Sequence, residues 1–163
     1  MEHYQGVVGS DSAAKTFTAA WSTGGATVVK PETFPQPPEG FHRLQQQLST
    51  LDVAPPQVLV VLAATGSYWV SLAVSLHQAG YHVSVVNPTH IHNYAKSLPR
   101  RSKTDNLDAL MLLHFAVERQ PPVWTPPPTV YHELRQRLVA RDGLLEMRQQ
   151  ARTHRHALRQ WPV

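Results

Sequence analysis

Residues 58–88 read VLVVLAATGSYWVSLAVSLHQAGYHVSVVNP and contain two short apolar runs with a longer segment between them. The first run, residues 58–62, is unbroken and of strand length, the pattern of a strand that is buried on both faces. Residues 67–79 predict a helix that ends at Gly80, and residues 81–86 predict a second buried strand. A strand, a helix and a strand in this order predict a right-handed crossover in an α/β sheet.

The segments before this stretch predict an antiparallel start to the same sheet. Three short segments predict strands, and these are residues 5–12, 16–22 and 27–33. Gly24-Gly25 separates the last two of them, which is typical of a hairpin. Pro38-Glu39-Gly40 then opens a predicted helix whose apolar residues, three and four apart, run from Phe41 to Leu51.

After the crossover, residues 90–98 and 104–118 predict two further helices. The order of elements is then β-β-β-α-β-α-β-α-α. This order predicts an α/β fold in which three antiparallel strands are followed by βαβ crossovers in one mixed sheet, with helices packed on its faces.

A proline-rich segment separates this fold from a basic helical arm. Residues 121–128 contain five prolines in eight positions, which excludes a helix or a central strand and predicts a stiff linker. Residues 131–160 form one long helical pattern with seven arginines between Arg135 and Arg159. We therefore expect a domain at residues 1–120, a linker at 121–128 and an arm at 129–163.

Two interpretations of the arm are open. Its arginines could lie along a nucleic-acid backbone, or the helix could pair with another helix as a short coiled coil. The apolar repeat is interrupted at Arg141 and Arg152, which argues against a long regular zipper.

The composition excludes several classes of protein. The chain has 163 residues, enough for one domain with a core and an appendage. Its hydrophobic content of 42% excludes disorder along the whole chain. Because there is no cysteine, a disulfide scaffold, a cysteine zinc site and thiol catalysis are all excluded.

Charge is unevenly distributed along the chain, whose formal net charge is +4. Residues 1–95 carry three basic and five acidic side chains, a net charge of −2. Residues 96–163 carry twelve basic and six acidic side chains, a net charge of +6. This basic second part is compatible with an anionic partner, nucleic acid first.

A long uncharged stretch has the length of a membrane span. It covers residues 58–76, but Thr65-Gly66-Ser67 interrupts it and no positive flank sets an orientation. The first residues of the chain also lack the long apolar stretch of a signal peptide. We expect a soluble protein of the cytoplasm that has no membrane partner.

Three aspartates are candidates for metal chemistry. Asp11 stands at the end of the first predicted strand, where a lone carboxylate is also a common turn former or helix cap. Asp105 and Asp108 are three residues apart on a predicted helix, so both can reach one divalent cation. The alternative is that acids in a first helical turn serve the helix dipole, with Thr104 as the cap.

Basic side chains cluster just before the two helical aspartates. They are Lys96, Arg100, Arg101 and Lys103. Carboxylates that hold magnesium, next to cations that contact phosphate, are the groups that metal-assisted phosphodiester chemistry needs. The alternative is a solvated basic loop whose charges have no specific partner.

Several segments together resemble the motifs of one family. Gly9-Ser10-Asp11, followed by Lys15-Thr16, resembles an opening Gly-Ile-Asp signature. Residues 64–69, Ala-Thr-Gly-Ser-Tyr-Trp, resemble a Glu-Ala-Thr-Gly-x-Tyr box from its second position onward. Three later segments resemble the next two boxes and the start of a helical extension, and these are residues 85–88, 101–109 and 133–135. Over nearly its whole length the chain resembles the DEDD-type insertion-sequence transposases of bacteria.

The resemblance implies a RuvC-like domain with the RNase H-like fold, in which four carboxylates, Asp-Glu-Asp-Asp, hold magnesium and act on DNA strands. By position, Asp11, Asp105 and Asp108 match three of them. Ala63 stands where the family has its glutamate, and no other acid lies between Asp52 and Asp105. We therefore expect magnesium binding to be weak or lost, and strand cleavage to be severely reduced.

The resemblance also implies partners. DNA is the first of them, and some members of the family use a structured guide RNA. The implied nucleic-acid contacts are basic residues, namely Lys96, Arg100, Arg101, Lys103, Arg135, Arg141, Arg148, Arg152 and Arg155. Through its arm the chain could also pair with a second copy or with a full-length transposase.

We therefore expect the N-terminal domain of a transposase that acts in DNA transposition, with impaired catalysis. Family members continue into a further domain with a serine proposed as the nucleophile, so we expect this chain to be a fragment or a truncated form. Two alternatives are open. One is a non-catalytic module that binds nucleic acid or protein, and the other is a decayed remnant of an insertion sequence.

Overall fold

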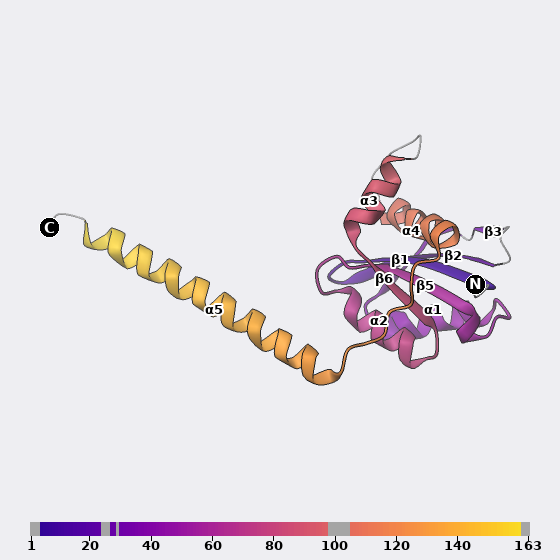
Figure 1. The fold of residues 1–163 in the computed structure, drawn as a ribbon, viewed down its shortest axis with the longest axis horizontal. Helices are drawn as coiled ribbons and strands as arrows, with labels where there is room; N and C mark the ends of the chain where they lie inside the picture. Colours follow the sequence, from indigo (N-terminus) through magenta and orange to yellow (C-terminus); the bar gives the residue numbers. More distant parts are fainter. Residues whose placement is uncertain (1–3, 24–26, 29, 98–104, 161–163) are drawn as a thin grey trace. The chain divides into compact units, whose positions relative to one another are not determined.

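The computed structural model describes residues 4–23, 27–28, 30–97 and 105–160, and a mixed β-sheet forms the centre of its N-terminal part (Figure 1). The chain divides into a first unit, residues 1–125, and a second unit, residues 126–163. The strands are β1 (Gly6–Ser12), β2 (Thr16–Thr23), β3 (Thr27–Val28), β4 (Glu32–Pro35), β5 (Val58–Ala63) and β6 (His82–Val86). The α-helices of the first unit are α1 (Glu39–Ser49), α2 (Trp69–Gln78), α3 (Pro88–Lys96) and α4 (Asp105–Arg119).

The strand order is β3-β2-β1-β5-β6, and β4 also pairs with β2. β1 and β2 are antiparallel, whereas β1 pairs with β5, and β5 with β6, in the parallel sense. The predicted crossover is confirmed, because α2 connects β5 to the parallel strand β6. An antiparallel start followed by parallel crossovers in one mixed sheet is the α/β arrangement predicted from the sequence.

The third predicted strand has different bounds in the structure. Instead of one strand over residues 27–33 there are two, β3 and β4, and both pair with β2. Val28 lies opposite Ser22, and Phe34 lies opposite Phe17. Pro31, between the two strands, has no N–H to donate to a ladder, which accounts for the interruption.

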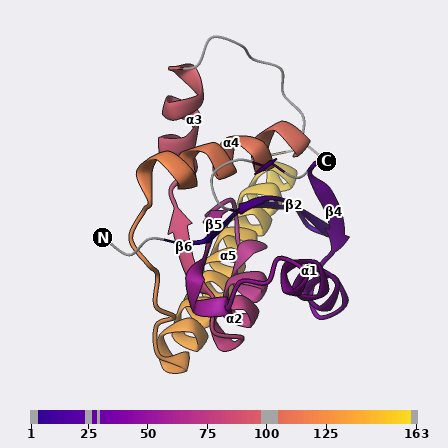
Figure 2. The same cartoon turned by 90° about the vertical axis from the view of Figure 1, so that its right-hand side faces the viewer.

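Helices cover both faces of the sheet, with α1 and α2 on one face and α3 and α4 on the other (Figures 1 and 2). On the α1 and α2 face, the rings of Phe17 and Phe34 are stacked with centroids 5.3 Å apart, in one buried cluster with Leu44 and Leu72. On the α4 face, the buried residues of β5 belong to a separate cluster with Leu112. All six residues of β5 are buried, as the unbroken apolar run predicts.

The uncharged stretch of residues 58–76 forms β5 and most of α2. Within the described part of the chain, no helix is both long enough and apolar enough to cross a membrane.

The segment after α4 covers the free edge of the sheet. The backbone N–H of Trp124 donates to the carbonyl of Val83 in the edge strand β6, with an N···O distance of 2.6 Å. The Trp124 ring lies edge-on to Trp69, at 5.7 Å between centroids, and to His77, at 6.4 Å. These contacts attach the segment to the first unit and protect strand groups that would otherwise be open to pairing with another chain.

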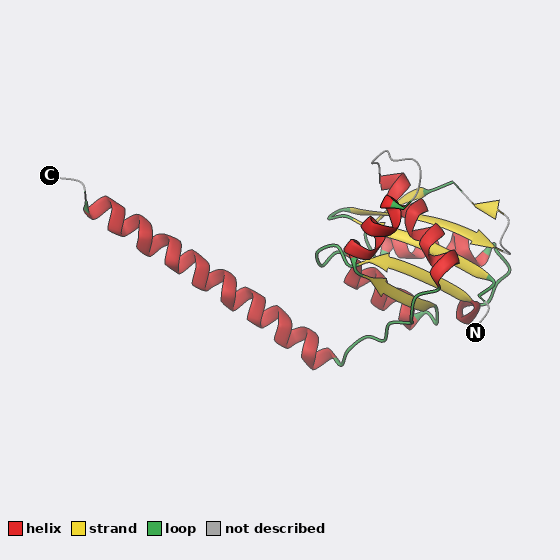
Figure 3. Cartoon of the chain, turned by 45° about the horizontal axis from the view of Figure 1, so that its top comes forward, coloured by secondary structure: helices red, strands yellow, loops and turns green. Residues whose placement is uncertain are grey.

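The second unit consists mainly of α5 (Thr129–Arg159), a continuous helix of 31 residues (Figure 3). It begins directly after Pro128, a residue that is well tolerated just before a helix because its missing N–H is not needed there. Nearly all of its side chains are exposed, and no residue of α5 is buried.

Candidate functional site

The parallel strands β1, β5 and β6 end at one edge of the sheet, and two of the predicted site positions lie there. Asp11 is near the end of β1, and Ala63 is the last residue of β5. Ser10 pairs with Leu62, so the next step of the same register places Asp11 beside Ala63. Because successive residues of a strand alternate between faces, Gly9 and Asp11 lie on one face of β1.

That face is the one covered by α4. A Cβ atom added to Gly9 would lie 2.6 Å from the carbonyl oxygen of Ala109 and 2.7 Å from the carbonyl carbon of Leu112. The backbone of α4 therefore packs directly against β1. Only glycine at position 9 leaves room for this close approach. Ala20 contributes a second small side chain to the buried cluster formed with Ala109 and Leu113.

This contact positions Asp108 at the same edge. Asp108 directly precedes Ala109, and α4 runs from the edge where the parallel strands end toward the edge where they begin (Figure 1). The side chains of Asp11 and Asp108 are both partly exposed. The two carboxylates therefore come from different elements but share one face and one edge of the sheet, within reach of solvent and of a ligand.

Ala63 lies on this same face. It is 6% exposed and belongs to the buried cluster with Val61 and Leu112, on the side of β5 that faces α4. The position that the family resemblance assigns to a glutamate is thus directly beside Asp11, and it presents a methyl group.

The remaining predicted positions are described only in part. Asp105 is the first residue of α4, and its side chain lies outside the description. Arg100, Arg101 and Lys103 also lie outside the described residues. Lys96 is the last residue of α3 and is exposed. Among the side chains that the structure does describe, no group of three or more His, Asp or Glu is arranged to hold a metal ion.

The predicted arginines of the arm do not all share one face of α5. With 3.6 residues per turn, Arg141, Arg148, Arg152 and Arg155 lie along one face, whereas Arg135 lies on another. All five side chains are exposed.

A cleft of about 720 Å³ lies next to the site edge, between β6, α3 and α4. Its polar lining includes Ser84, Asn87, His90, Asn93 and Arg119. Burial, and then the hydrogen bond that its hydroxyl donates to Glu118 (2.7 Å), raise the pKa of Tyr94 in the wall of this cleft.

Sequence reasoning did not predict the structural roles of two residues, Gly9 under α4 and Trp124 at the edge strand β6. Gly9 lies inside a strand pattern, which is the usual signal for a close approach of another backbone. Trp124 lies in the proline-rich segment predicted to be a linker, and no local signal indicates that its ring packs against the first unit.

Comparison with known proteins finds relatives along most of the chain. The model of a transposase family, the DEDD transposases of the IS110 type, matches residues 8–161. The pilin gene-inverting protein of Moraxella lacunata is 35% identical to this chain over 119 residues, and that of Moraxella bovis is 34% identical over the same length. Each match covers 73% of this chain and 36% of the relative, so the chain spans little more than a third of these curated relatives.

Comparison with solved structures gives matches that include two structures of RuvC. One is RuvC of Thermus thermophilus, with 14% sequence identity, a TM-score of 0.49, and coverage of 72% of this chain and 98% of that chain. The other is T. thermophilus RuvC in complex with a Holliday junction substrate, with 16% identity, a TM-score of 0.42, and coverage of 77% and 85%.

Proposed function

This chain belongs to the family of DEDD transposases of the IS110 type, and we propose that it supplies the RNase H-like unit that binds DNA in transposition, with strand cleavage impaired at Ala63. The observation that carries the proposal is the common location of Asp11, Ala63 and Asp108 on one face and at one edge of the sheet. Because the substrate is DNA, we place this activity in the bacterial cytoplasm.

The donor chemistry at this edge fits magnesium. Mg²⁺ takes oxygen ligands and is commonly held by one or two carboxylates together with water and substrate phosphates. Asp11 and Asp108 would provide the carboxylates, with Asp105 as a third from the first turn of α4. When bound, the ion would neutralise charge on a scissile phosphate and lower the pKa of an attacking water or hydroxyl.

The chain's own contribution is to hold these carboxylates in place. Asp11 is fixed by ladders on both sides of β1, since it pairs with Thr18 of β2 and follows the residue that pairs with Leu62 of β5. Asp108 is fixed by the contact of α4 with Gly9. Such preorganisation reduces the cost of bringing like charges together when a cation and a phosphate bind.

Ala63 removes a ligand from the centre of this arrangement. A methyl group cannot coordinate a cation, and the sequences of β5, β6 and α3 contain no acid that could replace it. We therefore expect lower magnesium affinity and slower strand cleavage than in a relative that has glutamate at this position.

The test is to restore the acid. We expect the Ala63→Glu variant to bind Mg²⁺ more tightly than the unaltered chain in titration calorimetry. Thr65→Glu is the matched control, because it adds the same charge to the exposed loop just after β5 but not to the α4 face. Equal magnesium affinity in the two variants, or no gain in either, would contradict the proposed role of position 63.

A second candidate function is a non-catalytic module that recruits an intact transposase. It is favoured by exposed apolar residues of α5 that are three, four and seven positions apart, namely Tyr131, Leu134, Leu138 and Leu145. A pull-down with a full-length relative distinguishes the two functions. Retention of the relative by a chain that binds neither DNA nor a structured guide RNA would favour the module over the DNA-binding unit.

A further inference from the structure

Six arginines of α5 form a single stripe along the helix. At about 100° per residue, their directions fall within an arc of about 60°. The stripe consists of Arg137, Arg141, Arg148, Arg152, Arg155 and Arg159. From the first to the last it extends about 33 Å along the helix axis. Arg135, the seventh arginine of α5, points about 130° away from the centre of the stripe.

The stripe is open to solvent and only lightly neutralised. All six side chains are exposed. Arg141 forms an ion pair with Asp142, with an N···O distance of 3.8 Å. In the described part of the chain, the other five arginines form no ion pair, and the acids Glu133, Asp142 and Glu146 lie outside the arc.

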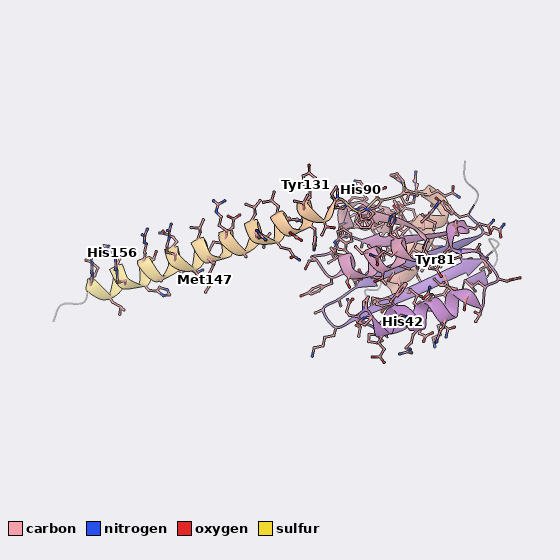
Figure 4. All side chains as sticks on the ribbon, turned by 90° about the horizontal axis from the view of Figure 1, so that it is seen from below. His42, Tyr81, His90, Tyr131, Met147 and His156 are labelled. Atoms are coloured by element: carbon pink, nitrogen blue, oxygen red, sulfur yellow. The ribbon has the colours of Figure 1, made fainter. Side chains whose placement is uncertain are left out.

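Three exposed apolar residues in the C-terminal part of α5 lie beside the stripe and not within it. Leu144, Met147 and Leu158 are exposed and lie to one side of the arginine stripe, on the face that Met147 marks in Figure 4. A helix packed on these apolar residues would leave the stripe accessible. A second copy packed stripe against stripe is disfavoured, because it would bring like charges together.

The arginines at the end of the stripe follow the same helical spacing as the exposed apolar residues at the start of α5, so side chains along this row change from apolar to cationic. The spacing of three and four that begins at Tyr131 includes Leu138 and Leu145, and it meets arginine at positions 141, 148, 152, 155 and 159. Leu145 is therefore the last apolar residue of this row. The arginines beyond Leu145 form a cationic surface that suits a polyanionic partner.

We propose that the arginine stripe is a docking surface for the backbone of duplex DNA, an inference that rests on the proposed function of the chain as a DNA-binding unit. Guanidinium groups bind phosphate through two parallel hydrogen bonds. Six guanidinium groups spread over about 33 Å of the helix can contact several phosphates of one duplex.

The geometry favours duplex DNA over the other nucleic acids. The major groove of B-DNA, about 12 Å wide, admits an α-helix, whereas that of an RNA duplex is too deep and narrow. Single strands are held by aromatic side chains on which bases stack. α5 has one aromatic residue, Tyr131, which lies before the stripe begins.

The experiment measures binding of the full chain to a fluorescent 20-base-pair DNA duplex by anisotropy over a range of salt concentrations. The main variant is the triple substitution Arg148→Gln, Arg152→Gln and Arg155→Gln. Arg152→Gln and Arg135→Gln form a matched pair, since each removes one exposed charge from α5. Glutamine keeps helix propensity close to that of arginine, and circular dichroism verifies the helix.

We expect the triple variant to lose on the order of tenfold or more in affinity near 0.1 M salt, and its salt slope to fall by about 2.7, because each lost phosphate contact removes about 0.9. Arg152→Gln should lower the slope by about 0.9, and Arg135→Gln should leave it unchanged. Unchanged binding by the triple variant, with binding by the unaltered chain intact, would overturn the stripe and leave the proposed function standing.

The other outcomes are equally distinct. Absence of DNA binding by the unaltered chain at low salt would contradict the proposed function itself. An effect of Arg135→Gln as large as that of Arg152→Gln would overturn the assignment to one face. Equal or tighter binding of an RNA duplex of the same length, lost in the triple variant, would overturn DNA as the occupant.

Discussion

Gly9→Ala should destabilise the chain strongly, because one added methyl group meets the backbone of α4. The new Cβ would lie 2.6 Å from the Ala109 oxygen and 2.7 Å from the Leu112 carbonyl carbon. Non-bonded carbon atoms prefer about 3.5–4.0 Å, so α4 would have to move by about 1 Å. Overpacking of a core costs about 1–3 kcal/mol, and backbone atoms cannot rotate away as side chains do. We therefore expect the free energy of unfolding to fall by about 3 kcal/mol.

Gly6→Ala on the same strand is the matched control. Its Cβ would lie 3.2 Å from Cγ2 of Val58, a side-chain atom that can shift by a few tenths of an ångström. We expect the control to cost less than about 1 kcal/mol. Urea unfolding followed by circular dichroism measures the free energy of unfolding of both variants. In a thermal scan, the melting temperature of Gly9→Ala should fall by about 6–12 °C.

The Gly9→Ala experiment also tests how Asp108 is positioned. If α4 moves away from β1, Asp108 moves away from Asp11, and the magnesium affinity gained in Ala63→Glu should be lost when Gly9→Ala is added. A free energy of unfolding within about 0.5 kcal/mol of the unaltered chain, or an equal cost in Gly6→Ala, would refute the close contact between β1 and α4.

Two further substitutions have definite outcomes. Burial raises the pKa of Tyr81, so the folded chain keeps this proton after the unfolded chain begins to lose it near pH 10. The free energy of unfolding should therefore fall as the pH rises above about 10. Urea midpoints at pH 9 to 11 should show a smaller fall in Tyr81→Phe than in the unaltered chain. An equal alkaline loss in both proteins would contradict this. A Cβ at Gly143 in α5 meets nothing within 4 Å, so Gly143→Ala should stabilise the helix by about 0.5–1 kcal/mol and raise its dichroism at 222 nm; reduced helicity would show that the account of this position is wrong.

The sequence predicts the β5-α2-β6 crossover well because its signals are local. An unbroken apolar run of strand length and a helix ended by Gly80 each indicate their element without reference to the rest of the chain. The prediction of a single strand over residues 27–33 was wrong, because Pro31 interrupts a ladder whose partner, β2, lies elsewhere in the chain. The attachment of Trp124 to β6 was missed for a different reason, because its contacts with Val83 and Trp69 are between residues distant in sequence.

The candidate site was predictable as a set of residues but not as a geometry. The family resemblance predicts Asp11, Asp105 and Asp108 as site residues, and it predicts position 63 by the acid that is lacking. The register of β1 with β5 and the close packing of α4 on Gly9 place Asp11, Ala63 and Asp108 on one face of the sheet. Helical spacing in the arm, in contrast, can be read directly from the sequence, because a long exposed helix needs no tertiary contact to define its faces.

At position 63, an alanine favours the stability of the fold, whereas a glutamate would favour cation binding. At a position that is 6% exposed, a carboxylate without a bound cation pays for desolvation beside the charge of Asp11, whereas a methyl group packs with Val61 and Leu112. Ala63→Glu should therefore lower the free energy of unfolding in the absence of magnesium, by about 1–3 kcal/mol. Magnesium that binds only the folded chain should restore part of this loss in proportion to the logarithm of its concentration. If Ala63→Glu is as stable as the unaltered chain without magnesium and gains nothing when magnesium is added, position 63 is neither buried beside Asp11 nor part of a cation site.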